Sequence, residues 1–198
     1  MISAVILAAG MSKRMGIPKQ LMDYNGKPML RVVVENTIKA PVDEIIVVLG
    51  NEAIQAARSL EGLAVKLAVN KNYAKGQSTS VRAGLELVER RARGVLFVLG
   101  DQPLVKVETI RLLVDSFKEK GGIAAPFYNG VRGNPVLFEN SLLQCADEIQ
   151  GDQGARGIIE LHPGLLNRVD VNDPGVLIDI DTWEDYRRLS GGEGGAGE

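Results

Sequence analysis

Residues 2–21 read ISAVILAAGMSKRMGIPKQL, an apolar run that passes directly into small residues and then into cations. The run at residues 2–8 is short and rich in Val, Ile and Leu, which predicts a buried strand. After it, Ala8, Ala9 and Gly10 would let a ligand approach the backbone closely, and unpaired amides there can bind a base or a phosphate. The stretch therefore predicts a strand followed by a ligand-binding loop.

Cationic side chains outnumber acidic ones between residues 10 and 31. The cations are Lys13, Arg14, Lys19, Lys27 and Arg31, and the one acid is Asp23. Such a local excess suits a polyphosphate, and an ordinary solvated loop explains the residue types equally well. Neither G-x-G-x-x-G nor G-x-x-x-x-G-K-[ST] is present, which excludes the two familiar phosphate loops.

The composition limits the class of protein. With 198 residues, 45% of them hydrophobic, the chain can form one sizeable core, and we expect one domain over residues 1–189. Its net charge of -2 and pI near 5.6 argue against nucleic acid or a membrane surface as the main partner. The Gly-rich residues 190–198 are expected to form a disordered tail.

The expected location is the cytoplasm. No apolar run approaches the roughly 18 residues of a membrane helix, and no signal-peptide pattern is present. A single cysteine, Cys145, allows no intrachain disulfide and no cysteine zinc cluster, which fits a reducing compartment.

Apolar runs alternate with segments of helical period in the first half of the chain. Buried strands are predicted at residues 2–8, 44–50, 65–70 and 94–100, and helices at 28–40, 52–62 and 78–93. This alternation predicts βαβ crossovers and an α/β fold, with a mostly parallel sheet between two helix layers. Ligands bind at the carboxyl ends of strands in such sheets, where the unusual loops of this chain fall.

The second half is less regular. Strands are predicted at 122–127 and 134–138, short helices at 140–149 and 152–162, and a final strand at 176–181. A helix over 182–189 would be capped by Thr182, with Glu184 and Asp185 in its first turn.

The loop LAAGMSKRMGIPKQL, residues 7–21, resembles the signature of nucleotidyltransferases that join a nucleoside monophosphate to a phosphorylated acceptor. Further segments resemble the molybdenum cofactor cytidylyltransferase branch: GQSTSVRAGL, VLGDQPLV, RGNPVLF, GDQGARGII and DIDTWEDY. These matches run from residue 3 to about residue 186. The resemblance implies a MobA-like nucleotidyltransferase with a Rossmann-like, three-layer α/β/α fold of the GT-A-like type and a mostly parallel mixed sheet.

Two aspartates are candidate metal ligands. Asp101 follows the predicted strand 94–100 and precedes Pro103, and a carboxylate there suits Mg²⁺. Residue type alone favours a role for Asp101 as the cap of the turn or of the helix that begins near Val107. The resemblance makes Asp181 the second ligand. Asp179 would share its face of the predicted strand, either beside the metal site or as a surface acid.

Nucleotide binding is assigned by the same resemblance. The nucleotide-binding residues would be Leu7, Ala8, Ala9, Gly10, Arg14, Lys19 and Ser80. Arg14, Lys19 and Asp101 would be catalytic, while Ser80 and the backbone of residues 7–9 would hold the base. By residue type, Ser78 or Thr79 would cap a helix, and Arg82 would either reach a phosphate or lie exposed.

The acceptor site is implied in two segments. Gly133 and Asn134 would border it, and Asp152 and Arg156 would contact the acceptor phosphate. A turn explains the first pair, and a helical ion pair explains the second. We assign no role to His162.

The resemblance implies transfer of CMP from CTP to the phosphate of molybdopterin, with Mg²⁺ and release of pyrophosphate. A molybdenum hydroxylase apo-enzyme would be a further partner. The methyl group of Ala9 would narrow the base pocket and favour a pyrimidine.

Three alternatives remain. They are a guanylyltransferase of the same cofactor, a methylerythritol phosphate-type cytidylyltransferase, suggested by PKQL, and a non-catalytic chaperone for the cofactor. The set of Arg14, Lys19, Asp101 and Asp181 argues against the chaperone, which would not need two metal carboxylates.

Overall fold

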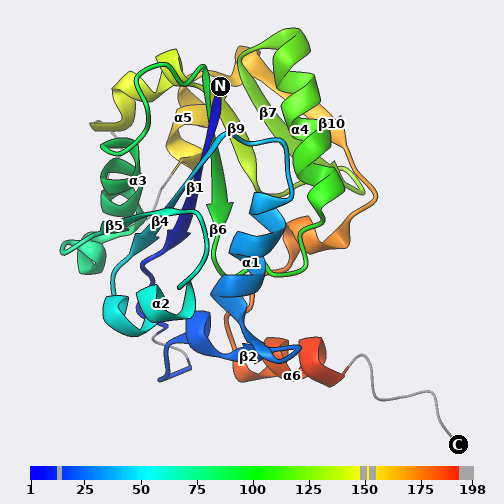
Figure 1. The fold of residues 1–198 in the computed structure, drawn as a ribbon. Helices are drawn as coiled ribbons and strands as arrows, with labels where there is room; N and C mark the ends of the chain where they lie inside the picture. The colour runs from blue at the N-terminus through cyan, green and yellow to red at the C-terminus, as the bar shows by residue number, and fades with distance from the viewer. Residues whose placement is uncertain (13–14, 148–150, 152–154, 192–198) are drawn as a thin grey trace, which may run out of the picture.

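The computed structural model describes residues 1–12, 15–147, 151 and 155–191 and arranges them in three layers (Figure 1). Within these residues, the middle layer is an eight-stranded mixed sheet. Its strands are β1 Ile2–Ala8, β4 Glu44–Leu49, β5 Lys66–Val69, β6 Gly94–Leu99, β7 Ile123–Tyr128, β8 Val131–Arg132, β9 Val136–Glu139 and β10 Leu166–Asp170. The order is β10-β7-β9-β6-β1-β4-β5, with β8 paired to β7.

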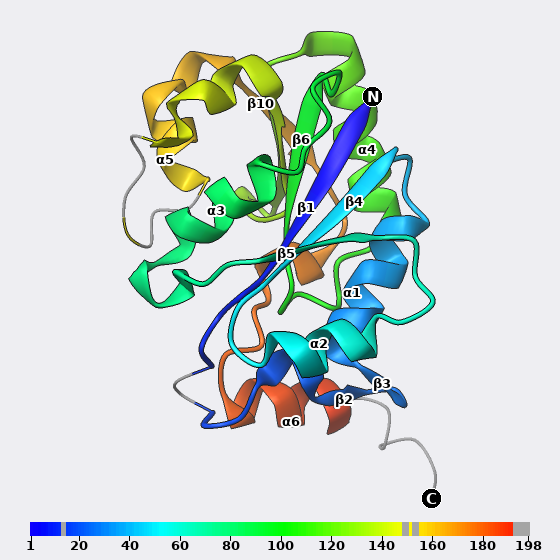
Figure 2. The same cartoon turned by 60° about the vertical axis from the view of Figure 1, so that its left-hand side comes forward.

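Helices cover both faces of the sheet (Figure 2). The α-helices are α1 Met29–Ile38, α2 Ala53–Ser59, α3 Gln77–Leu85, α4 Val107–Lys120, α5 Arg156–Leu161 and α6 Trp183–Gly191. Helices α1, α2 and α4 share one apolar cluster with the sheet, while α3 and α5 share the other. The hairpin of β2 Asp23–Tyr24 and β3 Lys27–Pro28 lies apart from the main sheet.

Strand β1 shows why the apolar runs become central strands. Every residue from Ile2 to Ala8 is buried, because successive side chains point to opposite faces and both faces carry helices. Ala4 and Ile6 pack in the cluster with α1 and α4, whereas Val5 and Leu7 pack in the cluster with α3 and α5.

The topology places a crevice at the carboxyl end of β1. Strand β1 pairs in parallel with β4 on one side and with β6 on the other. The chain runs from β1 to β4 and β5, then crosses through α3 to β6 on the opposite side of β1. The connections therefore diverge where β1 and β6 end, the position at which open α/β sheets bind ligands. The predicted α/β class is confirmed, and β9 adds antiparallel pairing to β6 and β7.

The prediction of a strand at 176–181 is wrong. The segment instead contains the 3₁₀ helix η6, Pro174–Leu177, followed by extended chain that pairs with no strand. The buried carboxylate of Asp173 fixes η6, because it accepts hydrogen bonds from the backbone N–H groups of Gly175 and Lys106 and from the hydroxyl of Thr109. The sheet edge is formed by β10, whose mixed sequence LNRVD did not indicate a strand.

Several helix boundaries also differ from the predictions. Helix α3 ends at Leu85, and turns occupy most of the remaining residues to 93. Its N-cap is Gly76, not Ser78 or Thr79, and Thr79 uses its hydroxyl to bind the carbonyl of Gly76. The predicted helix at 140–149 is the 3₁₀ helix η3, Asn140–Asp147, and residues 148–150 lie outside the described part. Helix α6 reaches Gly191, so only residues 192–198 of the predicted tail lie outside the described residues.

Candidate active site

A cleft of about 830 Å³ opens at the carboxyl ends of β1 and β6. Its walls come from the loop after β1, the 3₁₀ helices η1 (Lys19–Leu21) and η2 (Tyr73–Lys75), the start of α3 and two aspartate-bearing segments. The lining includes these predicted site residues: Leu7, Ala8, Ala9, Gly10, Lys19, Ser80, Asp101 and Asp181. Segments far apart in the sequence therefore meet in one cavity.

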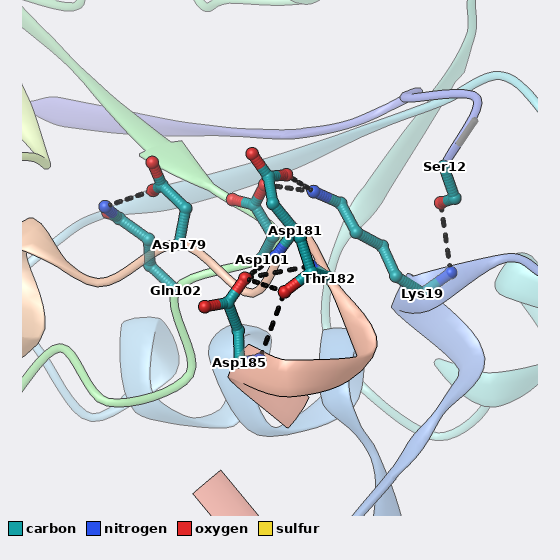
Figure 3. Close-up of polar contacts among 8 residues, drawn as sticks. All are labelled: Ser12, Lys19, Asp101, Gln102, Asp179, Asp181, Thr182 and Asp185. Atoms are coloured by element: carbon teal, nitrogen blue, oxygen red, sulfur yellow. Dashed lines mark hydrogen bonds and ion pairs between the residues drawn. The ribbon is translucent and has the colours of Figure 1, made fainter. Parts of the chain in front are cut away.

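Lys19 lies between two carboxylates in this cleft (Figure 3). Its Nζ atom is 2.6 Å from Oδ2 of Asp101 and 2.7 Å from Oδ1 of Asp181. The side chain of Lys19 is 14% exposed, whereas that of Asp181 is 36% exposed. Burial lowers the pKa of Lys19, but the two carboxylates outweigh burial and the net pKa is raised. The ammonium thus stays charged and holds both acids together.

Local structure fixes both aspartates. The backbone N–H of Ile180 donates to the carbonyl of Asp101 at 3.0 Å, which joins the two aspartate-bearing segments. Asp185 accepts hydrogen bonds from the backbone N–H groups of Asp181 and Thr182 and from the Thr182 hydroxyl, and its own N–H donates back to that hydroxyl. This reciprocal cap confirms the predicted role of Thr182 and holds Asp181 at the start of α6.

A third aspartate lines the same cleft. Gln102, which is buried, donates from Nε2 to Oδ1 of Asp179 at 2.7 Å (Figure 3). Burial, followed by the negative charge of Asp101, raises the pKa of Asp179 above its ordinary value. Asp179 and Asp181 thus face one cavity, as predicted, although they do so from extended chain and not from a strand.

The carboxylate pair fits a divalent cation. In the described part of the chain, no three His, Cys, Asp or Glu side chains gather as a metal-binding group. Asp101 and Asp181 nevertheless bring two oxygens to one point, where the ammonium of Lys19 provides the positive charge. Two carboxylates, with water and substrate phosphate completing the shell, are a usual protein contribution to a Mg²⁺ site.

Small residues form the wall next to β1. A Cβ atom at Gly50 would come within 2.7 Å of the Ala9 carbonyl oxygen, and one at Gly100 within 2.9 Å of the Ala8 Cβ. The ends of β4 and β6 therefore pack closely against Ala8 and Ala9. At Gly10, in contrast, a Cβ would meet nothing within 4 Å, so packing does not require glycine there. Close approach of a ligand to the backbone would require glycine at this position.

The other cations of the loop have different positions. Lys27 and Arg31 both pair with Glu35, at 2.7 Å and 3.0 Å, and neither lines the cleft. Lys13 and Arg14 lie outside the described residues. On either side of them, Ser12 accepts a hydrogen bond from the Lys19 N–H, and the carbonyl of Met15 accepts one from the Trp183 indole.

Of the predicted acceptor residues that the structure describes, Gly133, Asn134 and Arg156, none lines the cleft. The N–H of Asn134 donates to the Val176 carbonyl, and a Cβ at Gly133 would overlap Val176, so packing accounts for this turn. Arg156 is 71% exposed and pairs with Glu160 one helical turn away. Asp152 lies outside the described residues. Gly151, which directly precedes Asp152, lies against Gly76, and Gly76 lines the cleft.

Supporting residues hold this site, and of these Asn70 and Gln102 gave no clear sign in the sequence, whereas Asp185 was predicted only as a first-turn residue. Asn70, at the end of β5, donates to the hydroxyl groups of Thr79 and Ser80. Gln102 and Asp185 hold the aspartates, and each binds across a turn or between distant segments. His162 does not line the cleft, and of Cys145 only its place in η3 is described. Asp185 could have been found from its position three residues after Thr182.

An α/β sheet whose crevice holds two converging carboxylates and a lysine fits an enzyme that binds phosphorylated ligands at the ends of its strands. The chain belongs to the family described as "MobA-like NTP transferase domain", which matches residues 4–168. Lys19 and Asp101 lie inside this match, whereas Asp179 and Asp181 lie beyond it.

Individual proteins extend the similarity over nearly the whole chain. Nicotine blue oxidoreductase of Paenarthrobacter nicotinovorans is 30% identical, covering 95% of this chain and 96% of that protein. Molybdenum cofactor cytidylyltransferase of Escherichia coli is 26% identical, covering 93% of each. The crystal structure of Rv0371c from Mycobacterium tuberculosis in complex with manganese is 30% identical, covers 95% of this chain and 97% of its own, and has a TM-score of 0.82.

Among the described residues, no helix combines the length and the apolar character needed to cross a bilayer.

Proposed function

We propose that this nucleotidyltransferase moves CMP from CTP to the terminal phosphate of a molybdopterin-type cofactor and releases pyrophosphate. The observation that carries the proposal is the position of Lys19 between Asp101 and Asp181 in the lining of a cleft of about 830 Å³. The similarity to the cytidylyltransferase of Escherichia coli supports this choice of donor and acceptor.

The chain's own residues would counter negative charge. An oxygen of the acceptor phosphate attacks the α-phosphorus of CTP, and the bond from that phosphorus to the oxygen bridging to the β-phosphate breaks. The electron pair leaves with pyrophosphate. The attacking oxygen is already deprotonated near neutral pH, so no general base is needed. Lys19 and, from the resemblance, Arg14 would stabilise the triphosphate in the transition state.

Asp101 and Asp181 would hold Mg²⁺, which when bound neutralises phosphate charge and polarises the phosphoryl oxygens. A bound manganese ion in the similar Rv0371c structure supports a divalent cation, and Mg²⁺ is the ion that we propose here. Lys19 contacts the same two carboxylates.

The small residues at the end of β1 would favour cytosine. Ala9 lines the cleft, and its methyl group lies next to Gly50, which in turn lies against Tyr73. This row leaves little freedom for the wall to move and make room for a purine. The leucine-alanine-alanine-glycine backbone of residues 7–10 would then read one edge of the base.

The acceptor would enter on the side of the cleft bordered by Gly76 and Gly151. Roles for Asp152 and Arg156 in phosphate binding, and for Gly133 and Asn134 in shaping the approach, rest on the resemblance. A molybdenum hydroxylase apo-enzyme would receive the product.

The test is a pyrophosphate-release assay with Mg²⁺, CTP or GTP, and a panel of acceptors that includes molybdopterin and methylerythritol phosphate. We expect release with CTP and molybdopterin, at more than about tenfold the kcat/KM for GTP, because a misfitting purine leaves polar groups unpaired. A preference for GTP would overturn the cytidylyl part only. Release from no nucleotide would favour a binding module that protects the cofactor.

An oxidoreductase is a second candidate, favoured by the 30% identity to nicotine blue oxidoreductase. Oxidation of NADH or NADPH, followed by absorbance in the same set of reactions, tests it. We rank it second because paired metal carboxylates beside a lysine serve phosphate chemistry directly, whereas hydride transfer does not require them.

A further inference from the structure

Asn70 holds a fixed orientation behind the cleft wall. It follows β5, is 5% exposed, and donates its backbone N–H to the Leu49 carbonyl at 2.8 Å. Its side-chain Oδ1 accepts a hydrogen bond from the Asn72 N–H at 2.8 Å. Because a backbone N–H can only donate, the atom that faces it must be the amide oxygen. The NH₂ group of Asn70 therefore faces α3.

Both amide hydrogens of Asn70 are used on α3. Nδ2 lies 2.8 Å from Oγ1 of Thr79 and 2.9 Å from Oγ of Ser80. The hydroxyl of Thr79 donates to the carbonyls of Gly76 and Asn72, at 2.8 Å and 3.1 Å. Its hydrogen is thus occupied, and it stabilises the turn before α3.

Ser80 differs from Thr79 in where its own hydrogen can go. Its Oγ accepts a hydrogen bond from the Asn70 side chain, and among the described residues the Ser80 side chain makes this one hydrogen bond. Ser80 is 5% exposed and lines the cleft. A hydroxyl that already accepts from a fixed donor keeps its hydrogen for another acceptor. The cleft is where that acceptor would lie.

We propose that Asn70 is a positioning residue that makes Ser80 a hydrogen-bond donor to an acceptor atom of the bound nucleobase. This inference rests on the proposed function, because it requires a nucleoside triphosphate in the cleft. For cytosine the acceptor is O2 or N3. An amino group at the same position could use only the second lone pair of Ser80 Oγ and would leave the Ser80 hydrogen without an acceptor, so the relay contributes to base selection.

Binding titrations of CTP with Mg²⁺ test the relay without relying on turnover. Asn70→Asp keeps the size of the side chain and the acceptor for Asn72, but it replaces the NH₂ group with an acceptor that would take the Ser80 hydrogen. We expect a roughly tenfold increase in Kd for Asn70→Asp and for Ser80→Ala, and no further increase in the double variant. Unchanged affinity in Ser80→Ala, which leaves Asn70 in place, would overturn the proposal.

The matched control is Thr79→Ala, which removes the other hydroxyl bound to the same amide. Thr79 does not line the cleft, so we expect a lower Tm with unchanged CTP affinity. An equal loss of affinity in Thr79→Ala would show that Asn70 acts by holding the loop, and would overturn the relay.

Base analogues identify the acceptor atom of the nucleobase. One of the two analogues 2-thio-CTP and 3-deaza-CTP should bind to the wild type roughly tenfold more weakly than CTP does. That same analogue should bind to Ser80→Ala as tightly as CTP binds to Ser80→Ala. Equal weakening in both proteins, or in neither, would contradict the assignment. If CTP binds as expected but no acceptor yields pyrophosphate, the proposed function fails while the relay stands. If CTP does not bind at all, both fail.

Discussion

Two lysine–carboxylate clusters lie at opposite ends of the same parallel strands and differ in how far their charges are balanced. At the amino ends, Glu44 on β4 is 2.5 Å from Nζ of Lys66. It also accepts hydrogen bonds from the Ser3 hydroxyl at 2.6 Å and from the Glu89 N–H at 3.2 Å. We call Ser3, Glu44, Lys66 and Glu89 the amino-end cluster. One buried carboxylate there has three donors.

At the carboxyl ends the balance is reversed. Lys19, Asp101, Asp179 and Asp181, which we call the cleft cluster, place three carboxylates around the ammonium of Lys19, and Lys75 also belongs to the described lining of this cleft. The pKa of Glu44 is lowered, whereas that of Asp179 is raised. A carboxylate whose hydrogen-bond donors all come from the protein stabilises the fold, but it has no remaining need for the positive charge of a ligand. Incomplete pairing costs stability and provides a place for a cation and the phosphates that accompany it.

Removal of one cleft carboxylate should separate activity from stability most clearly. We expect Asp101→Asn to lower kcat by at least roughly 10²-fold, since it removes a preorganised ligand beside the transferring phosphate. The free energy of unfolding should change by less than about 1 kcal/mol, because Lys19 keeps Asp181 and one repulsive charge is lost. Pyrophosphate release and urea unfolding measure the two effects. Wild-type turnover in this variant would remove Asp101 from the metal site.

Loss of the cleft cation should have the next largest effect. Lys19→Met keeps an apolar stem but removes the ammonium that contacts Asp101 and Asp181. The loss in kcat/KM should correspond to about 2–3 kcal/mol of transition-state stabilisation. The kcat/KM of Arg14→Ala should fall by a similar factor if Arg14 also contacts the triphosphate. Lys27→Met is the control from the same cationic stretch. Lys27 pairs with Glu35 away from the cleft, so its kcat/KM should be unchanged.

The cleft end was more readable from the sequence than the elements at the sheet edge. Strands β1, β4 and β6 are mostly apolar runs, because burial on both faces favours apolar residues, and the buried Ser3 and Glu44 at their amino ends are hydrogen-bonded to each other. Strand β10 contains no fully buried residue, and its mixed sequence LNRVD therefore carries no continuous apolar pattern. The apolar residues of 176–178 suggested a strand, but the side chain of Asp173 holds that segment in a 3₁₀ turn.

The site residues were predicted on a different basis. Lys19, Asp101 and Asp181 could be predicted because the resemblance assigned them, and the structure brings all three into the cleft. Asn70 and Gln102 could not, since their roles depend on hydrogen bonds to partners 10 and 77 residues away, respectively. Five cations in one stretch also overstated the site. Tertiary structure gave two of them, Lys27 and Arg31, to Glu35.

The amino-end cluster should respond in the opposite sense. Glu44→Gln weakens the contact with Lys66 and leaves amide hydrogens facing other donors in a buried site, so the free energy of unfolding should fall by about 1–3 kcal/mol. kcat/KM should stay within about twofold of wild type, because the cluster lies at the far end of the strands from the cleft. Glu89→Gln is the control. Its carboxylate is 3.4 Å from Lys66 and half-exposed, and we expect a loss of less than about 0.5 kcal/mol. A larger loss of activity than of stability in Glu44→Gln would break the distinction between the two ends.

The smallest expected effect is the pH dependence of that difference. Burial would raise the pKa of Glu44, but the hydrogen bonds from Lys66, Ser3 and the Glu89 N–H outweigh it and hold the pKa below its ordinary value. A carboxyl group whose pKa is lower in the folded protein contributes stability above its unfolded pKa of about 4.3, and loses that contribution as the pH falls through its folded pKa. The stability gap between wild type and Glu44→Gln should therefore be largest near pH 7 and shrink on acidification below about pH 5. Urea unfolding of both proteins at matched pH values measures the gap, and the comparison cancels the titration of all other groups. A gap that stayed constant down to pH 3 would mean that packing, and not the ionised carboxylate, stabilises this end of the sheet.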